Sequence, residues 1–213
     1  ALNSDKNNDN NSDKNDADIL ASSSKGNTET LKFVEPIDIV KNPPKSACDF
    51  KFKGIDDFTG KVKFETHPEL WFAYTEPQLK SLMGKNDFIT AKASLTGLSG
   101  GIFYLILEIE IASKAAPIEF GVLDKGSALS ITLMNGEVIK VANRISDPGK
   151  VDAINNKTSY EGNFQLELSQ IKDLAKSEVD TVRLVWSSGF EDYDVFNVDL
   201  LMNAAQCLLD NSK

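Results

Sequence analysis

The residues FITAKASLTGLSGGIFYLILEIEI, from Phe88 to Ile111, decide the fold of this chain. They hold two long apolar stretches, and a short Ser-Gly-Gly turn at residues 99–101 separates them. The second stretch begins as a continuous apolar run and changes to strict alternation from Leu107 onward, which is typical of a strand with one buried face. The whole segment therefore predicts a long antiparallel pair of strands that is covered on both faces at one end.

Strand patterns recur on both sides of this pair. Residues 50–52 and 62–64 alternate apolar and charged side chains, so each segment predicts a half-buried strand. Asn135-Gly136 stands between two apolar runs and is the strongest signal for a two-residue hairpin in the chain. Further strands are predicted at residues 70–74, 118–123, 129–134, 138–141, 160–168, 179–187 and 193–196.

Helical spacing occurs in three short segments. Thr75 and Gln78 form the pattern of a capping box before a helix at residues 79–83, and Ser169 is predicted to cap a second helix that ends near residue 175. Near the C-terminus the polar face carries no lysine, so we expect the last helix to pack as a structural lid rather than to bind a membrane. The apolar residues at helical spacing in this last segment are Val198, Leu201, Met202, Ala205 and Leu208.

The predicted strands outnumber the helices and adjoin through short turns. This combination predicts a mainly β fold, and the economical architecture is an antiparallel β-sandwich. We expect two or three short peripheral helices on it, including a C-terminal helix.

The N-terminal segment differs in composition from the rest of the chain. Residues 1–30 are almost entirely Asn, Asp, Ser, Lys and small residues, which bury too little apolar surface to offset the entropy of the chain. The expected organisation is a flexible, acidic, Asn-rich tether at residues 1–30 and a single β-rich globular domain at residues 31–213.

The charge of the chain limits its partners. Its 213 residues have a net charge of -9, and Arg144 and Arg183 are the two arginines of the sequence. Binding to nucleic acid or to an anionic membrane depends on clustered basic side chains, and the sequence has no basic stripe. We therefore expect a neutral or cationic partner, either a protein or a carbohydrate of unknown identity, and no nucleic acid.

Two cysteines, Cys48 and Cys207, lie near opposite ends of the expected domain. A disulfide between them would close a very long loop and would stabilise the fold by about 4 kcal/mol or more in the chain-entropy model. Two buried thiols are the other interpretation, and the sequence leaves both open.

The chain begins at Ala1 rather than at a methionine, as expected if a targeting segment has been removed, so we expect an exported protein.

Residues 97–101, Gly-Leu-Ser-Gly-Gly, match the G-x-S-x-G pattern of a catalytic serine. That pattern requires a helix after the serine and a histidine later in the chain, whereas here a strand follows and the single histidine, His67, comes earlier. The segment is therefore interpreted as a hairpin turn.

One histidine and two distant cysteines also exclude the usual zinc arrangements. No glycine-rich phosphate loop is present, so we expect the chain not to be an enzyme.

Calcium is the better metal candidate, although we expect no resident cofactor. Residues 5–16 place oxygen ligands at positions 1, 3, 5, 9 and 12 of a loop, and these are Asp5, Asn7, Asp9, Asp13 and Asp16. The spacing resembles acidic calcium repeats such as dockerin and thrombospondin type 3 loops. It departs from an EF-hand because Asn10 replaces the turn glycine, Asp16 replaces the bidentate glutamate, and no helices flank the loop. Such spacing arises easily among so many Asp and Asn residues, so a solvated tether is the preferred interpretation.

The candidate ligand-binding residues combine aromatic rings with carboxylates. They lie in the segment after Trp186 and at residues 71–74, and they are Phe190, Glu191, Asp192, Tyr193, Asp194, Trp71 and Tyr74. A surface of this composition suits a sugar, a cation or a basic partner. In both segments the preferred interpretation is that the aromatic rings return to the core.

An acidic, Asn-rich segment ahead of a β domain resembles exported lipoproteins of Bacteroidetes-type bacteria. The passage VDTVRLVWSSGFEDYDVFNVDLLMNAAQCL, from Val179 to Leu208, is similar to the ends of uncharacterised proteins of that kind. The resemblance implies export to the cell envelope, at the outer-membrane surface or in the periplasm, with membrane contact only through a removed N-terminal lipid anchor. No cysteine stands at position 1, so the anchor is inferred rather than seen.

The function favoured by these observations is a non-catalytic, exported binding or interaction module whose ligand is unknown. The competing hypothesis is a hydrolase, for example one acting on glycans, with two carboxylates drawn from Glu108, Glu110, Glu191, Asp192 and Asp194. A purely structural envelope protein is a third hypothesis. A deep pocket with convergent carboxylates would favour the enzyme, whereas a shallow aromatic face would favour the binding module.

Overall fold

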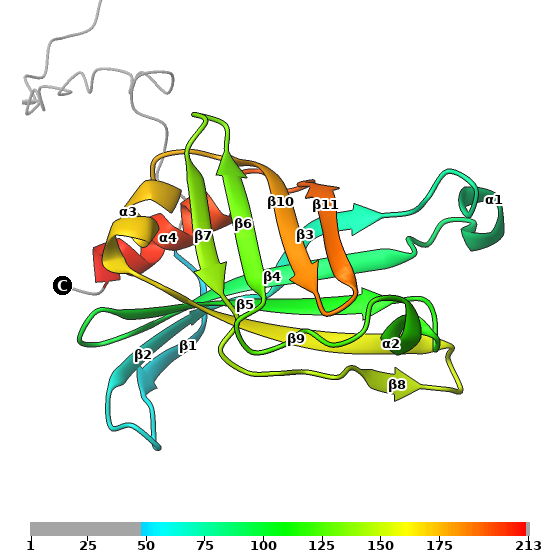
Figure 1. The fold of residues 1–213 in the computed structure, drawn as a ribbon. Coiled ribbons are helices and arrows are strands. Elements are labelled where there is room, and N and C mark those ends of the chain that lie inside the picture. Colours follow the sequence, from blue (N-terminus) through cyan, green and yellow to red (C-terminus); the bar gives the residue numbers. More distant parts are fainter. Residues whose placement is uncertain (1–47, 212–213) are drawn as a thin grey trace, which may run out of the picture. The chain divides into compact units, whose positions relative to one another are not determined.

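The computed structural model describes residues 48–211, which form two facing antiparallel sheets and four helices (Figure 1). The large sheet has the strand order β1-β2-β4-β5-β9-β8, and β3 also pairs with β4. Its strands are β1 (Phe50–Ile55), β2 (Val62–Thr66), β3 (Glu69–Tyr74), β4 (Ile89–Leu98), β5 (Ile102–Ile111), β8 (Lys150–Asp152) and β9 (Lys157–Leu166). The small sheet has the order β11-β10-β6-β7, with β6 (Ala128–Leu133), β7 (Val138–Ala142), β10 (Val179–Trp186) and β11 (Gly189–Asp194). The predicted mainly β, antiparallel sandwich is thus confirmed.

The hairpin of β4 and β5 lies at the centre of the large sheet. Its ten-residue strands pair along their whole length, and β9 continues the sheet on the other side of β5. The turn contains Gly100 and Gly101 with φ values of 96° and 78°, a region that a Cβ atom disfavours. The adjacent Ser99 accepts a hydrogen bond at its Oγ from the backbone N–H of Val62 at 3.2 Å. The G-x-S-x-G match is therefore a hairpin turn, as the sequence predicts.

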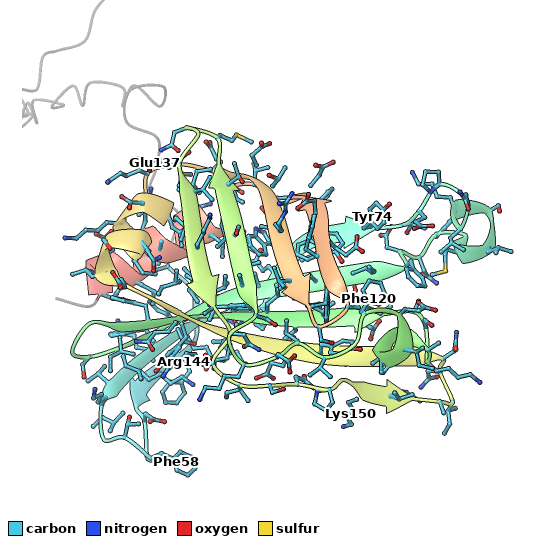
Figure 2. The ribbon with its side chains drawn as sticks, in the orientation of Figure 1. Phe58, Tyr74, Phe120, Glu137, Arg144 and Lys150 are labelled. Carbon is cyan, nitrogen blue, oxygen red and sulfur yellow. A yellow bond between two sulfur atoms is a disulfide. The ribbon has the colours of Figure 1, made fainter. Side chains whose placement is uncertain are left out.

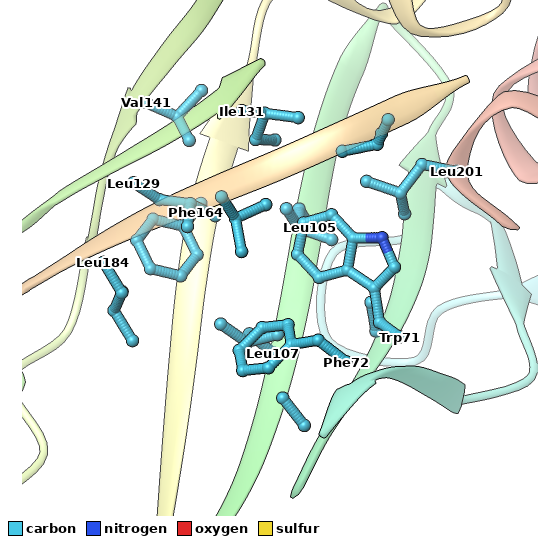
Figure 3. Packing of buried hydrophobic residues seen from close by; sticks show 14 of the residues in the cluster. Trp71, Phe72, Leu105, Leu107, Leu129, Ile131, Val141, Phe164, Leu184 and Leu201 are labelled. Carbon is cyan, nitrogen blue, oxygen red and sulfur yellow. The ribbon is translucent and has the colours of Figure 1, made fainter. Parts of the chain in front are cut away.

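The core lies between the two sheets, where alternate residues of the central strands point inward (Figure 3). Fully buried side chains at this interface include Leu105, Leu107 and Phe164 from the large sheet and Leu129, Ile131 and Leu184 from the small sheet. Trp71 and Phe72 are adjacent in sequence but are both buried, because the pairing of β3 with β4 shifts register between Leu70 and Phe72. Burying side chains of this size contributes about 1.5–3 kcal/mol each, so the interface supplies much of the stability.

Two helices pack side by side at one end of the sandwich, α3 (Leu168–Leu174) and α4 (Leu200–Asn211) (Figure 1). Helix α4 also contacts β4. Its buried residues are Leu200, Leu201, Ala204, Ala205 and Leu208. The expectation that the terminal helix packs on the domain is confirmed, although Val198 precedes the helix and Met202 is only half-buried.

A disulfide joins Cys48 to Cys207 across 159 positions of sequence. It ties Cys48, two positions before β1, to Cys207 on α4, so the disulfide interpretation of the cysteines holds rather than that of two buried thiols. The predicted tether at residues 1–30 and its boundary with the domain at residue 31 lie outside the described residues.

The first predicted helix cap differs in the structure. Helix α1 (Lys80–Met83) has no side-chain cap. Thr75 is instead engaged with the far end of the same loop, where its Oγ1 donates to Asp87 Oδ1 at 3.0 Å and accepts from the backbone N–H of Phe88 at 2.9 Å. Its hydroxyl therefore closes the loop that contains α1 rather than starting the helix.

Two further local predictions are wrong. Glu167 rather than Ser169 is the N-cap of α3, and its backbone N–H donates to Gln170 Oε1 at 2.8 Å. Residues 118–123 do not form a strand, because Pro117 lies in the first turn of α2 (Ala116–Glu119) and favours helical dihedral angles there. A single isolated bridge at Leu123 is all that remains of that predicted strand.

Candidate functional site

The outer face of the large sheet carries a continuous set of polar side chains. Because side chains alternate along a strand, the residues of β4, β5 and β9 that do not enter the core point to solvent. The register places Lys92, Glu108 and Glu161 in one row across these three strands, and Tyr104 lies two rows away. Residues directly opposite in such rows have Cβ atoms about 4.5–5.5 Å apart.

This face is hollowed into what we call the outer groove, which consists of two depressions of about 440 and 370 Å³ that share Glu108 and Glu161. The first depression reaches β8 at one edge of the sheet, where Figure 2 shows Lys150, and the second reaches the β1–β2 hairpin. Besides the shared pair, the first is lined by residues that include Lys92, Glu110, Asp147 and Lys150, and the second by residues that include Lys63, Glu65, Tyr104 and Asn163.

The floor of the outer groove mixes an aromatic ring, aliphatic carbon and polar groups. Tyr104 and Ile106 are half-buried, and Thr96 is almost fully covered. The Oδ1 atom of Asn163 is buried and accepts no hydrogen bond from any described residue. A buried acceptor without a partner costs about 1–3 kcal/mol, so a hydrogen-bond donor from a ligand or from water would be favourable here.

Glu65 and two lysines hold the hairpin side of the groove. Lys51 Nζ lies 2.7 Å from Glu65 Oε1, and Lys63 Nζ lies 2.6 Å from Glu65 Oε2. Burial raises the pKa of Glu65, but the hydrogen bonds and positive charges of the two lysines together outweigh burial and keep that pKa below its ordinary value. The carboxylate is therefore charged at neutral pH, and this cluster fixes the geometry of the wall.

Glu108 and Glu161 face one another across β5 and β9 at the centre of the outer groove. Neither side chain forms a hydrogen bond or an ion pair with another residue in the part of the chain that the structure describes. Their neighbour Glu110, by contrast, lies 2.6 Å from Lys157 Nζ. Like charges directly opposite on neighbouring strands are destabilising, so a ligand that donates hydrogen bonds to this pair would relieve a local cost.

The loop between β7 and β8 forms the other wall and is docked onto β9 by two side chains. Asn143 is buried, its Nδ2 donates to the carbonyl of Leu123 at 3.1 Å, and its Oδ1 accepts from the backbone N–H of Asn163 at 2.9 Å. Asp147 Oδ2 accepts from the backbone N–H of Glu161 at 2.6 Å. These bonds set the position of the wall relative to the carboxylate pair.

The residues predicted at positions 190–194 lie on β11, an edge strand of the small sheet, and they do not gather into one site. Arg183 makes two hydrogen bonds to Asp192, from Nε at 2.6 Å and from Nη2 at 2.7 Å, and these lower the pKa of Asp192. The same guanidinium lies over the ring of Phe190, 4.3 Å from its centroid. Glu191 and Asp194 are exposed on the same strand.

Two of the candidate ligand residues belong to the core, so the core interpretation preferred for them is confirmed and they do not bind a ligand directly. Trp71 is fully buried beside a bulge in β3, and Tyr193 is 3% exposed because it points between the sheets. The Tyr193 ring stacks on Phe72 with centroids 4.5 Å apart, and burial raises the pKa of its hydroxyl well above the ordinary value. Tyr74 remains 40% exposed at the end of β3 and meets Tyr193 edge-on at 6.1 Å.

The predicted calcium ligands lie outside the described residues, and they are Asp5, Asn7, Asp9, Asp13 and Asp16. Within residues 48–211, no group of three or more His, Cys, Asp or Glu side chains is placed to hold a metal ion. No helix in the same range is both long and apolar enough to cross a membrane.

The sequence does not predict Tyr104, Glu161 or Asn163 as members of a site. Each lies inside a segment that the sequence predicts as a strand, and the sequence alone does not indicate which strands neighbour one another. The alternation of residues 160–166 does indicate which side chains share a face. Tyr160 and Phe164 are buried on one face of the strand, so the polar residues between them, Glu161 and Asn163, lie on the opposite face.

Comparison with known proteins does not assign a function to the outer groove. Comparisons with protein-family models, with curated proteins and with solved structures find no match for the chain. The function is therefore proposed from the outer groove and from the chemistry of the residues that line it.

Proposed function

We propose that the chain is an exported, non-catalytic binding module that holds a carbohydrate chain in the outer groove. The observation that carries the proposal is the pair of unpaired carboxylates at the centre of the groove, those of Glu108 and Glu161. They lie in a hollow that also contains the half-buried ring of Tyr104.

The chemistry of a sugar fits this arrangement better than that of a charged peptide. Sugar hydroxyls both donate and accept hydrogen bonds, so they match a surface that holds both carboxylates and the ammonium groups of Lys92 and Lys63. A strongly cationic peptide would be repelled by these lysines, and a strongly anionic peptide would be repelled by the central pair of carboxylates. Tyr104 offers an aromatic face with a polar end, which suits the apolar face and the hydroxyl rim of a sugar ring.

The proposed export is supported by the disulfide between Cys48 and Cys207, because disulfides persist mainly in oxidising compartments. The resemblance to exported lipoproteins supports a place in the cell envelope, at the outer-membrane surface or in the periplasm. In that setting residues 1–30 would act as a spacer, and a flexible chain of that length spans tens of ångströms on average.

Affinity electrophoresis in gels that contain soluble polysaccharides tests the proposal. A panel of neutral polysaccharides, such as xylan, glucomannan and starch, is compared with a gel without polysaccharide. We expect at least one polysaccharide to retard the wild-type protein, and Tyr104→Ala to weaken that retardation by about tenfold, since loss of an aromatic contact costs about 0.5–1.5 kcal/mol beyond the lost area.

Tyr74→Ala is the matched control, because Tyr74 is an exposed tyrosine on β3 that does not line the groove. Glu161→Gln has its own control in Glu137→Gln, which changes an exposed glutamate in the turn between β6 and β7. The proposal is rejected if none of the polysaccharides retards the protein, or if both tyrosine variants lose retardation equally.

A glycan-acting hydrolase is the second candidate, and one observation favours it. Glu108 and Glu161 face one another on neighbouring strands, and retaining glycosidases hold two carboxyl groups about 5–5.5 Å apart. Release of reducing ends from the same polysaccharides would support this candidate, provided that Glu108→Gln abolishes the release while binding remains. Retardation without any release of reducing ends would favour the binding module.

A further inference from the structure

The outer face of the small sheet holds a second hollow, on the opposite side of the sandwich core from the outer groove. It has a volume of about 440 Å³. The strand register places Asp192, Arg183, Ser130 and Lys140 in one row from β11 through β10 and β6 to β7. Two cationic side chains therefore flank a serine hydroxyl at the middle of this face.

Arg183 is held in a fixed orientation within this row. Asp192 accepts hydrogen bonds from its Nε and Nη2 at 2.6 and 2.7 Å, and the ring of Phe190 lies 4.3 Å from its guanidinium carbon. A guanidinium has five N–H donors, and Asp192 accepts two of these, so three remain for a ligand. Because the side chain is already ordered, binding a ligand costs little additional side-chain entropy.

The rest of the hollow offers donors. Lys140 Nζ makes no ion pair with any described residue, and its side chain is exposed. The hydroxyls of Ser130, Thr132 and Thr181 also line the hollow, and the structure gives them no partner within residues 48–211. The only carboxylate that lines the hollow is that of Asp192, and it is already bound to Arg183.

We propose that this hollow binds a single oxyanion group, a carboxylate, sulfate or phosphate, between Arg183 and Lys140. Arginine presents parallel N–H donors that match the oxygens of such groups, and charge-assisted hydrogen bonds of this kind are about twice as strong as neutral ones. Among the residues that line the hollow, Arg183 and Lys140 outnumber Asp192, so the lining is positive on a chain whose net charge is -9, although Asp194 lies opposite Thr181 in the next row of the same face. The acidic remainder of the chain disfavours long anionic polymers, and the hollow therefore suits one charged group on an otherwise neutral ligand.

The test is a titration of ¹⁵N-labelled protein with sodium sulfate, inorganic phosphate and sodium glucuronate, each at an ionic strength held constant with sodium chloride. We expect saturable shifts of the amide signals of Ser130, Lys140 and Arg183 with at least one of these anions, and no such shifts with glucose. A stronger response to glucuronate would identify a sugar carboxylate as the group, and a stronger response to sulfate or phosphate would identify an ester of that acid.

Variants separate the site from a general effect of salt. Lys140→Gln leaves the Arg183–Asp192 pair intact and is expected to weaken anion binding by about tenfold, as the loss of one charge-assisted hydrogen bond predicts. Arg183→Gln is expected to abolish saturable binding. Lys92→Gln is the matched control, because Lys92 lines the outer groove and not this hollow.

The proposal is overturned if the amide shifts stay linear in anion concentration, or if Lys140→Gln and Lys92→Gln change the anion affinity to the same extent. It is also overturned if the protein binds vesicles that contain phosphatidylglycerol but binds none of the small anions. The thermal midpoint of each variant is measured alongside, and an unchanged midpoint attributes the lost shifts to the hollow rather than to unfolding. Failure here leaves binding in the outer groove untouched, because the two sites share no lining residue.

Discussion

Leu201→Ala is expected to destabilise the domain by about 2–5 kcal/mol, the range for replacing a fully buried leucine by alanine. Leu201 is 0% exposed and lies on the buried face of α4, and Figure 3 shows its side chain in the same cluster as Trp71. The substitution removes three carbon atoms from this cluster. The helix is also held by the disulfide at Cys207, so it cannot easily move away to close the cavity that is left.

The assay is equilibrium unfolding in guanidinium chloride, together with the thermal midpoint. For a domain of this size each kcal/mol shifts the thermal midpoint by about 2–4 °C, so the expected fall is about 4–20 °C. Leu82→Ala is the matched control, since Leu82 on α1 is 81% exposed and its removal should change the free energy of unfolding by about 0.5 kcal/mol or less. If Leu201→Ala leaves the midpoint unchanged but abolishes association with vesicles or with a partner, the helix is a functional surface and the packing role is wrong.

Two further predictions concern covalent and electrostatic contributions to stability. Replacing both Cys48 and Cys207 by serine removes a cross-link across 159 positions and should lower the free energy of unfolding by about 5 kcal/mol in the chain-entropy model, and a reducing agent should reproduce the loss in the wild type but not in the variant. The lowered pKa of Glu65 means that its contribution to stability is present above the unfolded pKa of about 4.3 and is lost as the pH falls through the folded pKa. Glu65→Gln should therefore lower the thermal midpoint at pH 7 by more than it does at pH 3, and an equal loss at both values would contradict the ion-pair cluster with Lys51 and Lys63.

Much of the fold could be predicted because the strands carry strong local signals. The alternation in residues 107–111 and the Asn135-Gly136 turn each depend on neighbours in sequence, and both segments form the predicted hairpins. The first predicted helix cap failed because it depends on a longer-range contact. Thr75 has the right spacing to cap a helix, but its hydroxyl bonds to Asp87 and Phe88 across a loop, and no local pattern indicates that preference.

The candidate site could be predicted only in part, because a groove on a sheet face depends on which strands are neighbours. Glu108 was among the predicted carboxylates, but its partner Glu161 lies 53 positions later and is brought opposite it by the pairing of β5 with β9. In the aromatic segments the core interpretation is correct for Trp71 and Tyr193, whereas Phe190 and Tyr74 are exposed. The bulge in β3 turns Trp71 into the core, and the pleat of β11 turns Tyr193 inward, so composition alone does not indicate which rings reach the surface.

The disulfide between Cys48 and Cys207 also determines how the domain bears a mechanical load. Residue 47 directly precedes Cys48, so a pull on the N-terminal segment enters the domain at the sulfur bridge. Part of the tension then passes to α4, whose leucines are buried, instead of acting on β1 alone. Strand β1 is an edge strand and would otherwise peel from β2 one hydrogen bond at a time. If such a domain were anchored at its N-terminus and pulled through a bound ligand, it would thus stay folded under forces that would separate an edge strand without the disulfide.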